Sequence, residues 1–478
     1  GCTQPAGIGC VQTGSEGQIG TMSGRRRRVL FVSYAFPPTG GVGVQRVTKF
    51  VKYLPEYGWD CSVLTVENPS VPLIDETLLG EIPPSTIVRR TRTWEPGYAV
   101  KRAVSASGDG GRGNLLVRTL KGAARRVVGG LLQPDPQILW RRPALRAGLK
   151  LLAESRHDVI VATGPPFSSL LLGSTLKKKT GIPLVLDYRD EWGISNAYWE
   201  NKRPGPVARY VQNRMQRHCL RAADLVLATT PSSTAAIANV AAEAGSGCGS
   251  ACITNGFDPP DFAHYETTTG PRPDYGQGID RFRLTFVGTL WALNPIGPLV
   301  DAIERLARTS PRLLEQLELV LAGRRTAEQE AMLDRLQGLP CSVVRLPFVS
   351  HDEACRLMRA ADALLLLNAD YPETHRIINA KTFEYMAARR LMFVIAPEGD
   401  IHDVVRDLPG SVLGNPRDPG QIAEQLALQL EQHRCGVSCE GTAWDISRFE
   451  RRQLAGELGD QLARLAGARA VEPSYSVH

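Results

Sequence analysis

Val29-Leu-Phe-Val-Ser-Tyr34 is a short, continuous apolar run, and Phe36-Pro-Pro-Thr-Gly-Gly-Val-Gly43 follows it as a glycine-rich turn. The apolar run is typical of a strand that is buried on both faces of a sheet. Apolar residues at helical spacing over 45–54 come next, and a second apolar run over 61–66 follows them. Strand, turn, helix and strand in this order predict a βαβ unit with parallel strands.

The alternation of strand and helix patterns continues outward from this unit along most of the chain. It stops at two stretches rich in Gly, Ala, Ser, Pro or Thr, at 242–252 and 267–278, and then resumes. Two such series predict an α/β protein with two doubly wound parallel-sheet, Rossmann-like domains. The further strands are predicted at 158–162, 183–187, 224–228, 282–287, 317–322, 343–346, 363–367 and 392–395.

The breaks also predict the domain organisation. We expect a disordered extension over 1–24, an N-terminal domain over 25–260, a linker over 261–279, a C-terminal domain over 280–440, and a closing helix and tail over 441–478. The closing helix is predicted from an amphipathic, charged pattern over 450–465.

The composition is that of a globular protein, with 43% hydrophobic and 22% charged residues in a chain of 478. No apolar stretch approaches the ~20 residues that are needed to cross a bilayer. Residues 1–21 lack the apolar core of a secretory signal. We therefore expect a cytoplasmic protein.

The ten cysteines do not form a metal-binding pattern. Cys248/Cys252 and Cys435/Cys439 each show a C-x3-C spacing, but no further Cys or His completes a zinc site around either pair. The chain also has no Asp-x-Asp pair that could chelate a metal diphosphate. We expect reduced thiols, no metal and no cofactor.

Positive charge is concentrated in the segment 101–150, which holds eleven Lys or Arg against two acidic residues. Apolar residues at helical spacing over 116–131 predict an amphipathic helix with a basic face. Such a helix can lie on an anionic membrane surface, or it can dock on the protein with its basic face in solvent. Nucleic acid is not expected as a partner, because no binding motif accompanies the charge.

The turn at 39–46 is a candidate anion site, because glycine lets backbone N–H groups approach a phosphate at the start of a helix. Gly41 and Gly43 match a dinucleotide-binding turn, but Arg46 occupies the third glycine position. The turn also lacks the Lys-Ser/Thr end of a P-loop. A tight turn that needs glycine only for its backbone is the alternative.

The second domain supplies cations that could meet the charge of a diphosphate. Arg324 and Arg325 follow the predicted strand 317–322. Lys381 and Glu384 lie one helical turn apart, so that both can face the same ligand. A structural ion pair between these two residues is the alternative.

Six segments occur in an order that resembles the family 4 retaining glycosyltransferases of the GT-B fold, the group 1 type of bacterial cell-surface polysaccharide synthesis. That fold places two Rossmann-like domains on either side of a central cleft, with a nucleotide-sugar between them. The resemblance extends over about 28–465. The segments are 36–46, 187–192, 253–258, 286–289, 321–324 and 381–386.

The resemblance implies roles for individual residues. The C-terminal domain would bind the nucleotide-sugar donor, and the N-terminal domain would lie on the acceptor side with Arg189 and Trp192. Arg324 would neutralise the diphosphate, and Glu384 would accept hydrogen bonds from the ribose. The implied donor-binding residues are Gly40, Gly41, Gly288, Thr289, Arg324, Lys381 and Glu384.

The chain departs from the family at three places. Arg376 stands where the family has the first of two glutamates spaced eight positions apart. The histidine expected after the Gly-Pro-Pro turn is absent from 167–171, and 288–295 contains no basic residue. Either His375 or Arg376 could substitute for the missing cation, and simple drift of this loop is the alternative. With Asp190, these two residues are the catalytic candidates.

The predicted function is transfer of a sugar from a nucleotide diphosphate sugar to a hydroxyl of a saccharide or lipid-linked saccharide, with retention of configuration. The expected enzyme is a metal-independent hexosyltransferase, cytoplasmic or peripheral on the inner membrane face. A non-catalytic partner subunit with the same fold is the first alternative, because of the departures above. A nucleotide-sugar epimerase or hydrolase is the second.

Overall fold

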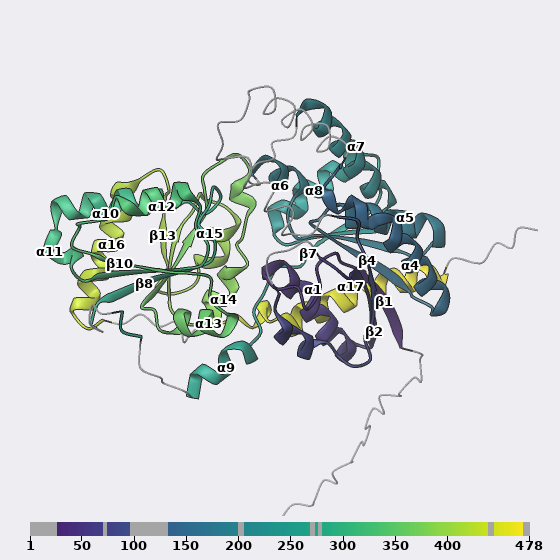
Figure 1. The fold of residues 1–478 in the computed structure, drawn as a ribbon, viewed down its shortest axis with the longest axis horizontal. Helices are drawn as coiled ribbons and strands as arrows, with labels where there is room; N and C mark the ends of the chain where they lie inside the picture. The colour runs from purple at the N-terminus through teal and green to yellow at the C-terminus, as the bar shows by residue number, and fades with distance from the viewer. Residues whose placement is uncertain are drawn as a thin grey trace, which may run out of the picture.

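The computed structural model describes residues 26–69, 74–95, 132–198, 205–267, 273–275, 280–437 and 444–471. The predicted extension 1–24 and the predicted basic helix 116–131 lie outside these residues. The described residues form two domains side by side, each a parallel sheet with helices on both faces (Figure 1). The predicted fold class is therefore confirmed. Within this part of the chain, no helix combines the length and the apolar character needed to cross a bilayer.

The N-terminal domain contains a seven-stranded sheet with the strand order β3-β2-β1-β4-β5-β6-β7. Its strand β1 (Arg27–Val32), helix α1 (Val42–Tyr53) and strand β2 (Trp59–Val66) confirm the predicted βαβ unit. The strand order reverses between β1 and β4 (Val159–Gly164), so the carboxyl ends of these two strands border a crevice. The other strands are β3 (Ile87–Thr91), β5 (Leu184–Tyr188), β6 (Leu225–Ala228) and β7 (Gly249–Cys252).

Buried apolar side chains join this sheet to helices on both of its faces. Helix α1 packs on one face. Four further helices pack on the other face. These are α4 (Arg141–Glu154), α5 (Ser168–Thr180), α7 (Pro206–Ala222) and α8 (Pro231–Glu243).

The C-terminal domain contains a six-stranded sheet with the strand order β10-β9-β8-β11-β12-β13. Its order reverses between β8 and β11, which gives this domain a crevice of its own. The strands are β8 (Phe282–Val287), β9 (Leu317–Ala322), β10 (Ser342–Leu346), β11 (Ala363–Leu367), β12 (Leu391–Ile395) and β13 (Val412–Gly414). The helices are α10 (Gly297–Thr309), α11 (Pro311–Leu314), α12 (Ala327–Asp334), α13 (His351–Arg359), α14 (Lys381–Ala387), α15 (Asp400–Val405) and α16 (Pro419–Arg434).

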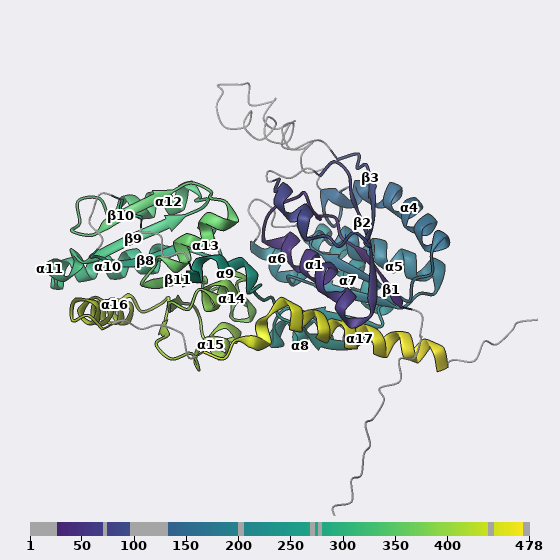
Figure 2. The ribbon, with the colours of Figure 1, turned by 90° about the horizontal axis from the view of Figure 1, so that it is seen from below.

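The last helix, α17 (Arg451–Val471), follows the C-terminal domain in sequence but packs on the N-terminal domain. Figure 2 shows it running along the underside of that domain. Leu454, Leu458 and Leu462 are almost fully buried in the same core as Val29 and Phe31 of β1. The helix therefore completes the second face of the N-terminal sheet.

The strands β3, β7 and β13 lie where the sequence predicts no strand, and all three are at the edges of their sheets. Strand β7 falls inside the predicted break 242–252, and α9 (Pro260–Thr267) overlaps the start of the predicted linker. Strand β7 is an edge strand that pairs only with β6, and its Gly-Ser-Ala-Cys sequence is half-exposed. Backbone pairing forms such a strand without the apolar pattern that reveals a central one.

Candidate active site

The turns after β8 and β9 touch each other at the carboxyl edge of the C-terminal sheet. A Cβ atom on Gly323 would lie 1.9 Å from the backbone oxygen of Gly288, and Gly323 has a φ of +127°. The Leu290 N–H donates to the Arg324 carbonyl over 2.9 Å, which holds the two turns in register. Only glycine at position 323 permits this approach. As a result, Thr289 and Arg324 both lie at the same edge of the sheet.

Arg324 and Arg325 have different surroundings, although the sequence offers both as cations. The Arg325 guanidinium donates to the carbonyls of Gly323 and Leu346 over 2.9 and 2.8 Å and pairs with Glu330 at 2.6 Å. Arg325 therefore fixes the turn. The Arg324 side chain is exposed and forms no hydrogen bond or ion pair with any residue that the structure describes. Of the two, Arg324 is the one that can meet an incoming anion.

Lys381 and Glu384 form an ion pair within the first turn of α14. The Glu384 side chain is only 10% exposed. The structural ion pair that the spacing allows is thus present. For Glu384 to bind a ribose, it would have to exchange its contact with Lys381 for the ligand.

On the N-terminal side, Arg189 joins two turns that border the crevice between β1 and β4. Its guanidinium donates to the carbonyls of Gly43 and Pro165. A Cβ on Gly43 would lie 2.8 Å from Arg189 Nη1, so glycine makes room for this contact. Burial lowers the pKa of Arg189. Arg189 therefore shapes the crevice, and Gly40 and Gly41 precede α1 at the same edge.

Asp190 follows Arg189 directly and reaches solvent. Desolvation by neighbouring protein atoms raises the pKa of Asp190, against the opposing effect of the Arg189 charge. A carboxylate with a raised pKa is a better proton acceptor than an ordinary surface aspartate. Of the three catalytic candidates, Asp190 thus has the most suitable surroundings for a general base.

Trp192 lies behind the crevice rather than in it. Its side chain is 1% exposed and stacks on Phe167 with ring centroids 4.4 Å apart. The indole N–H donates to Gln212 over 3.2 Å. A side chain this deeply buried cannot contact an acceptor. Phe167 therefore packs against Trp192 in the core of the domain. It follows the Gly-Pro-Pro turn and begins the segment that lacks the family's histidine.

The other two catalytic candidates, His375 and Arg376, lie where the domains meet. Arg376 Nη1 pairs with Glu191 Oε2 of the N-terminal domain at 3.2 Å, and Glu191 also accepts from Ser233 Oγ over 2.6 Å. Thr230 Oγ1 donates to the Arg376 carbonyl over 2.8 Å. We refer to Glu191, Thr230, Ser233 and Arg376 as the interdomain bridge. The Arg376 charge is thus already neutralised by a protein carboxylate.

Asp400 makes a second contact between the domains next to this bridge. Its carboxylate accepts from Ser232 N and Oγ over 3.0 and 2.5 Å. A Cβ on the preceding Gly399 would lie 2.2 Å from the His375 carbonyl, so glycine allows the loop of the bridge to pack on α15. The His375 side chain itself is exposed. Glu191 and Asp400 carry no local sequence signal that would have identified them.

Arg376→Met is expected to weaken the contact between the domains by about 1–3 kcal/mol, the usual range for a hydrogen bond to a charged group. Burial already raises the pKa of Glu191, and Arg376 opposes that shift. Without Arg376, the pKa of Glu191 rises further above the ~4.3 of an unfolded glutamate. A carboxyl group whose pKa is higher in the folded than in the unfolded protein lowers the free energy of unfolding as the pH rises. The variant should therefore be less stable at pH 8 than at pH 5.

Urea unfolding at both pH values measures this effect. Adding Glu191→Gln to Arg376→Met removes the unpaired carboxylate and should abolish the extra pH dependence. An equal loss at pH 5 and pH 8 in the single variant would contradict the assignment of the bridge.

Two protein-family models match the chain, one in each of the two domains. A family model described as "Glycosyl transferase 4-like domain" matches residues 40–245, and one described as "Glycosyl transferases group 1" matches residues 281–432. The chain is a glycosyltransferase that combines a 4-like domain with a group 1 domain. No similar relative was found among curated proteins. The first region covers the N-terminal domain from the turn before α1 to the end of α8, and the second covers all six strands of the C-terminal sheet.

Solved structures share the fold of this glycosyltransferase. HepE of Anabaena, in complex with UDP and glucose, is 17% identical with a TM-score of 0.57, covering 92% of this chain and 100% of that one. The α,α-trehalose 6-phosphate synthase of Burkholderia multivorans is 13% identical with a TM-score of 0.59, covering 95% and 100%. A glycosyltransferase of Rickettsia africae is 12% identical with a TM-score of 0.54, covering 92% and 98%. These likenesses establish the GT-B arrangement of the two domains.

Arg46 of this glycosyltransferase, which occupies the third glycine position of the turn, anchors the junction between the domains. Its guanidinium pairs with Asp187 at 2.9 Å, and each of these side chains is only 2% exposed. Arg46 also donates to the Thr254 carbonyl over 2.8 Å, and Thr163 donates to Asp187 over 2.9 Å. The residue that disqualifies the turn as a dinucleotide-binding motif is therefore a buried structural cation.

A second buried ionic cluster links α1 to the chain segment that leads into the C-terminal domain. Lys49 Nζ, 2% exposed, lies 2.6 Å from Asp258 Oδ2 and 2.7 Å from Glu81 Oε2. Tyr53 OH donates to Asp258 over 2.5 Å, and Lys52 lies 3.1 Å from the same carboxylate. These contacts fix the position from which the chain leaves the N-terminal domain.

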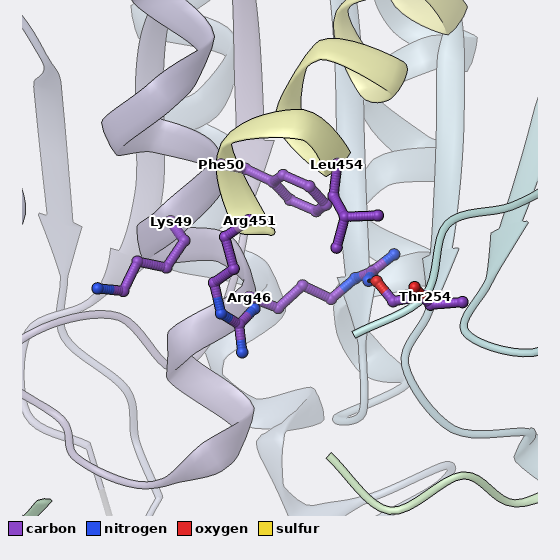
Figure 3. A pocket seen from close by; sticks show the side chains of 6 residues that line it. All are labelled: Arg46, Lys49, Phe50, Thr254, Arg451 and Leu454. Carbon is purple, nitrogen blue, oxygen red and sulfur yellow. Dashed lines mark hydrogen bonds between the residues drawn. The ribbon is translucent and has the colours of Figure 1, made fainter. Parts of the chain in front are cut away.

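A narrow cavity, too small to hold a water molecule, lies between these two clusters (Figure 3). In Figure 3, Arg46 extends towards Thr254, while Arg451 at the start of α17 points between Arg46 and Lys49. Arg451 is 7% exposed, and burial lowers its pKa. Phe50 and Leu454 supply the apolar lining. The cavity is part of the junction between α1, α17 and residue 254, and Arg451 is close enough to Glu384 of α14 for their charges to interact.

His351 extends this ionic junction to α13 of the C-terminal domain. Its Nε2 lies 3.3 Å from Asp261 Oδ2, and this hydrogen bond, with a contact to Cys355 Sγ, raises the pKa of His351 to about 10. Burial would raise the pKa of Asp261, but the His351 hydrogen bond and the Lys49 charge outweigh it and lower the pKa. The histidine is therefore protonated at neutral pH in the folded protein.

His351→Gln should destabilise this glycosyltransferase in a pH-dependent way. Unfolded histidine loses its proton near pH 6.5, whereas folded His351 keeps it to about pH 10. Its contribution is thus complete below about pH 6.5 and is lost as pH rises towards 10. We expect a loss of about 1–2 kcal/mol at pH 6, since the pair is partly screened by solvent. Urea unfolding at pH 6, 8 and 10 checks this, with the exposed His218→Gln as a control that should show no such trend.

The structure thus brings three of the predicted donor residues to one edge of the C-terminal sheet, while Gly40 and Gly41 lie with Arg189 at the edge of the N-terminal sheet. Gly288, Thr289 and Arg324 are grouped by the two touching turns. The described residues contain no group of three His, Cys, Asp or Glu side chains placed to hold a metal ion.

Proposed function

We propose that this glycosyltransferase moves a sugar from a nucleotide diphosphate sugar to a hydroxyl of a saccharide or lipid-linked saccharide, with retention of configuration and without a metal ion. We place this reaction in cell-surface polysaccharide synthesis, in the cytoplasm or at the inner membrane face. The structures of HepE contain UDP with glucose, or UDP-glucose, which makes a UDP-sugar the first donor to test.

The observation that carries the proposal is the surroundings of Arg324. The side chain is exposed at the carboxyl edge of the C-terminal sheet, on a turn that Gly288, Gly323 and Arg325 hold in place. Ligands of doubly wound domains bind at such edges. An unpaired guanidinium on a fixed turn suits the oxygen atoms of a diphosphate.

The chemistry of transfer requires stabilisation of the leaving diphosphate and removal of a proton from the acceptor. Arg324 and the backbone N–H groups of the glycine turns would stabilise the charge that develops on the leaving group. Asp190, with its raised pKa, would accept the acceptor's proton directly or pass it to the leaving phosphate. Asp190 belongs to the N-terminal domain and Arg324 to the C-terminal domain, so the reaction would take place between the two.

Thermal unfolding with a panel of UDP-, GDP- and ADP-sugars tests donor binding, since a ligand that binds the folded state raises Tm. The panel is run with EDTA and with added magnesium. One nucleotide class should raise Tm in both conditions. Arg324→Ala should then weaken binding of that donor by about 10–100-fold, equivalent to one charged hydrogen bond.

Arg312→Ala is the matched control, because Arg312 is exposed on α11 of the same domain, away from the carboxyl edge of the sheet. It should leave donor binding unchanged. Unchanged binding in Arg324→Ala, or stabilisation only with magnesium, would contradict the proposed donor site or its metal independence respectively.

A non-catalytic partner subunit is the second candidate, and the surroundings of Arg376 favour it. The guanidinium of Arg376 already pairs with Glu191, so it is not available to neutralise a bound ligand. Asp190→Asn separates the two functions: an enzyme keeps donor binding but loses transfer, by about 100-fold or more. A partner subunit shows no transfer with either form of the protein.

A further inference from the structure

A basic groove on the outer side of the N-terminal domain lies apart from the donor and acceptor crevices. It has a volume of about 490 Å³ and is bordered by α4, α5 and α7. Figures 1 and 2 place α4 and α5 at the side of the domain that faces away from the C-terminal domain. Its lining side chains are Arg141, Ser174, Thr175, Lys178, Lys179 and His218.

The cations of this groove have no carboxylate partner among the described residues. Lys177, one residue before the groove lysines, pairs with Asp224 at 2.5 Å, whereas Lys178 and Lys179 are exposed and pair with none of the residues that the structure describes. Glu154, the acidic residue of α4, pairs with Arg89, and α7 contains no acidic residue. Positive charge in the groove is therefore uncompensated.

Arg141 is held in place at the inner side of the groove. Its Nη2 donates to Thr175 Oγ1 over 2.9 Å, while its Nε is buried and has no hydrogen-bond partner. The Thr175 hydroxyl in turn donates to the Leu171 carbonyl over 2.8 Å, which fixes the side chain. Arg141 is thus oriented before any ligand arrives, and one of its donors is unsatisfied.

The position of Arg141 in α4 also costs stability unless an anion is near. It is the first residue of the helix, where the partial positive charge of the helix dipole disfavours a cation. An anion in the groove would offset this repulsion and the mutual repulsion of Arg141, Lys178 and Lys179. The lysines near the end of α5, by contrast, agree with the dipole of their own helix.

We propose that this groove is a binding site for a phosphate-bearing anion, best matched by a diphosphate. The guanidinium of Arg141 offers fixed, planar donors to phosphate oxygens, and Lys178 and Lys179 add two mobile charges. His218 supplies a further ring nitrogen from α7. The site is separate from the donor site and does not depend on the proposed function.

Inorganic pyrophosphate is the probe, measured by calorimetric titration of the full chain. Lys178→Glu combined with Lys179→Glu should weaken its binding by about 10–100-fold, because two charge-assisted contacts become repulsive. Arg146→Glu is the matched control, since Arg146 is an exposed arginine of α4 that does not border the groove. It should change binding by less than about two-fold.

Arg324→Ala distinguishes the groove from the donor site. Pyrophosphate binding at the groove should persist in this variant, even if the donor proposal fails. Both groove lysines are exposed, so the double variant should keep the wild-type Tm, and Arg141→Gln provides a second, milder loss of affinity.

Vesicles distinguish a free diphosphate from a lipid headgroup as the source of the anion. Sedimentation with phosphatidylcholine vesicles containing phosphatidylglycerol is compared with sedimentation with phosphatidylcholine alone. Binding to the anionic vesicles that the lysine double variant loses and Arg146→Glu keeps would assign the groove to a headgroup. If the double variant binds pyrophosphate and vesicles as the wild type does, or if Arg146→Glu loses as much, the proposal is wrong.

Discussion

Gly323→Ala is expected to lower the free energy of unfolding by about 2–4 kcal/mol, at the upper end of single-substitution effects. Two costs combine in this variant. The φ of +127° disfavours any side chain, and the new Cβ would lie 1.9 Å from the Gly288 carbonyl oxygen. The neighbouring atom is backbone, so it cannot move away without displacing the turn after β8.

Gly338→Ala separates these two costs. Gly338 lies in the same domain with a φ of +81°, but nothing would lie within 4 Å of a Cβ there. Its substitution should cost only about 1–2 kcal/mol for the left-handed backbone. Urea unfolding of both variants gives the difference, which measures the contact between the two turns. Equal losses would mean that the turns can separate freely.

Gly323→Ala should also impair donor binding, since Arg324 and Thr289 flank the contact between the two turns that this substitution displaces. We expect the affinity of any donor found in the thermal panel to fall by about 10-fold or more. Gly338→Ala should leave it unchanged. Unaltered affinity in Gly323→Ala would show that the geometry of these turns does not position the donor.

Arg46→Met is the second substitution with a large expected effect, about 3–5 kcal/mol of lost stability. Removing the guanidinium leaves Asp187, which is 2% exposed, with only the Thr163 hydroxyl as a partner. A buried carboxylate without its cation retains its full desolvation cost. The Thr254 carbonyl also loses its donor, so the segment leading into the second domain is less firmly held.

Arg335→Met is the control for this prediction. Arg335 pairs with Asp301 and Glu304 on the surface of the C-terminal domain, and its side chain is 39% exposed. Its loss should cost at most about 1 kcal/mol, as for most exposed ion pairs. Calorimetry or urea unfolding compares the two variants. A loss of similar size in both would mean that burial adds little to the Arg46–Asp187 pair.

The central strands could be predicted because strands buried on both faces must be apolar throughout. The run at 29–34 and the strand at 363–367 are of this kind, and both lie in the middle of their sheets. Strand β7 could not be predicted, because an edge strand needs backbone partners rather than a particular composition. The predicted strand end at 322 identified Arg324, whereas Gly288 and Thr289 were implied only by the family resemblance.

The junction between the domains could not be predicted. Glu191 and Arg376 are 185 positions apart, and Ser232 and Asp400 are 168 apart. No local period connects such residues, since only the packing of one domain against the other brings them together. Arg46 shows the same limitation: its sequence position suggested an imperfect phosphate turn, while its actual partner, Asp187, is 141 positions away.

Helix α17 has a consequence for the order in which the protein can fold during synthesis. Residues 454–462 occupy the core beneath β1, yet they leave the ribosome only after the whole second domain. Although α1 covers part of that face of the sheet, the part beneath α17 must stay uncovered in the nascent N-terminal domain while more than 150 further residues are translated. Completion of the first domain is thus tied to completion of the chain, and a ribosome that stalls in the second domain releases a product with an open core.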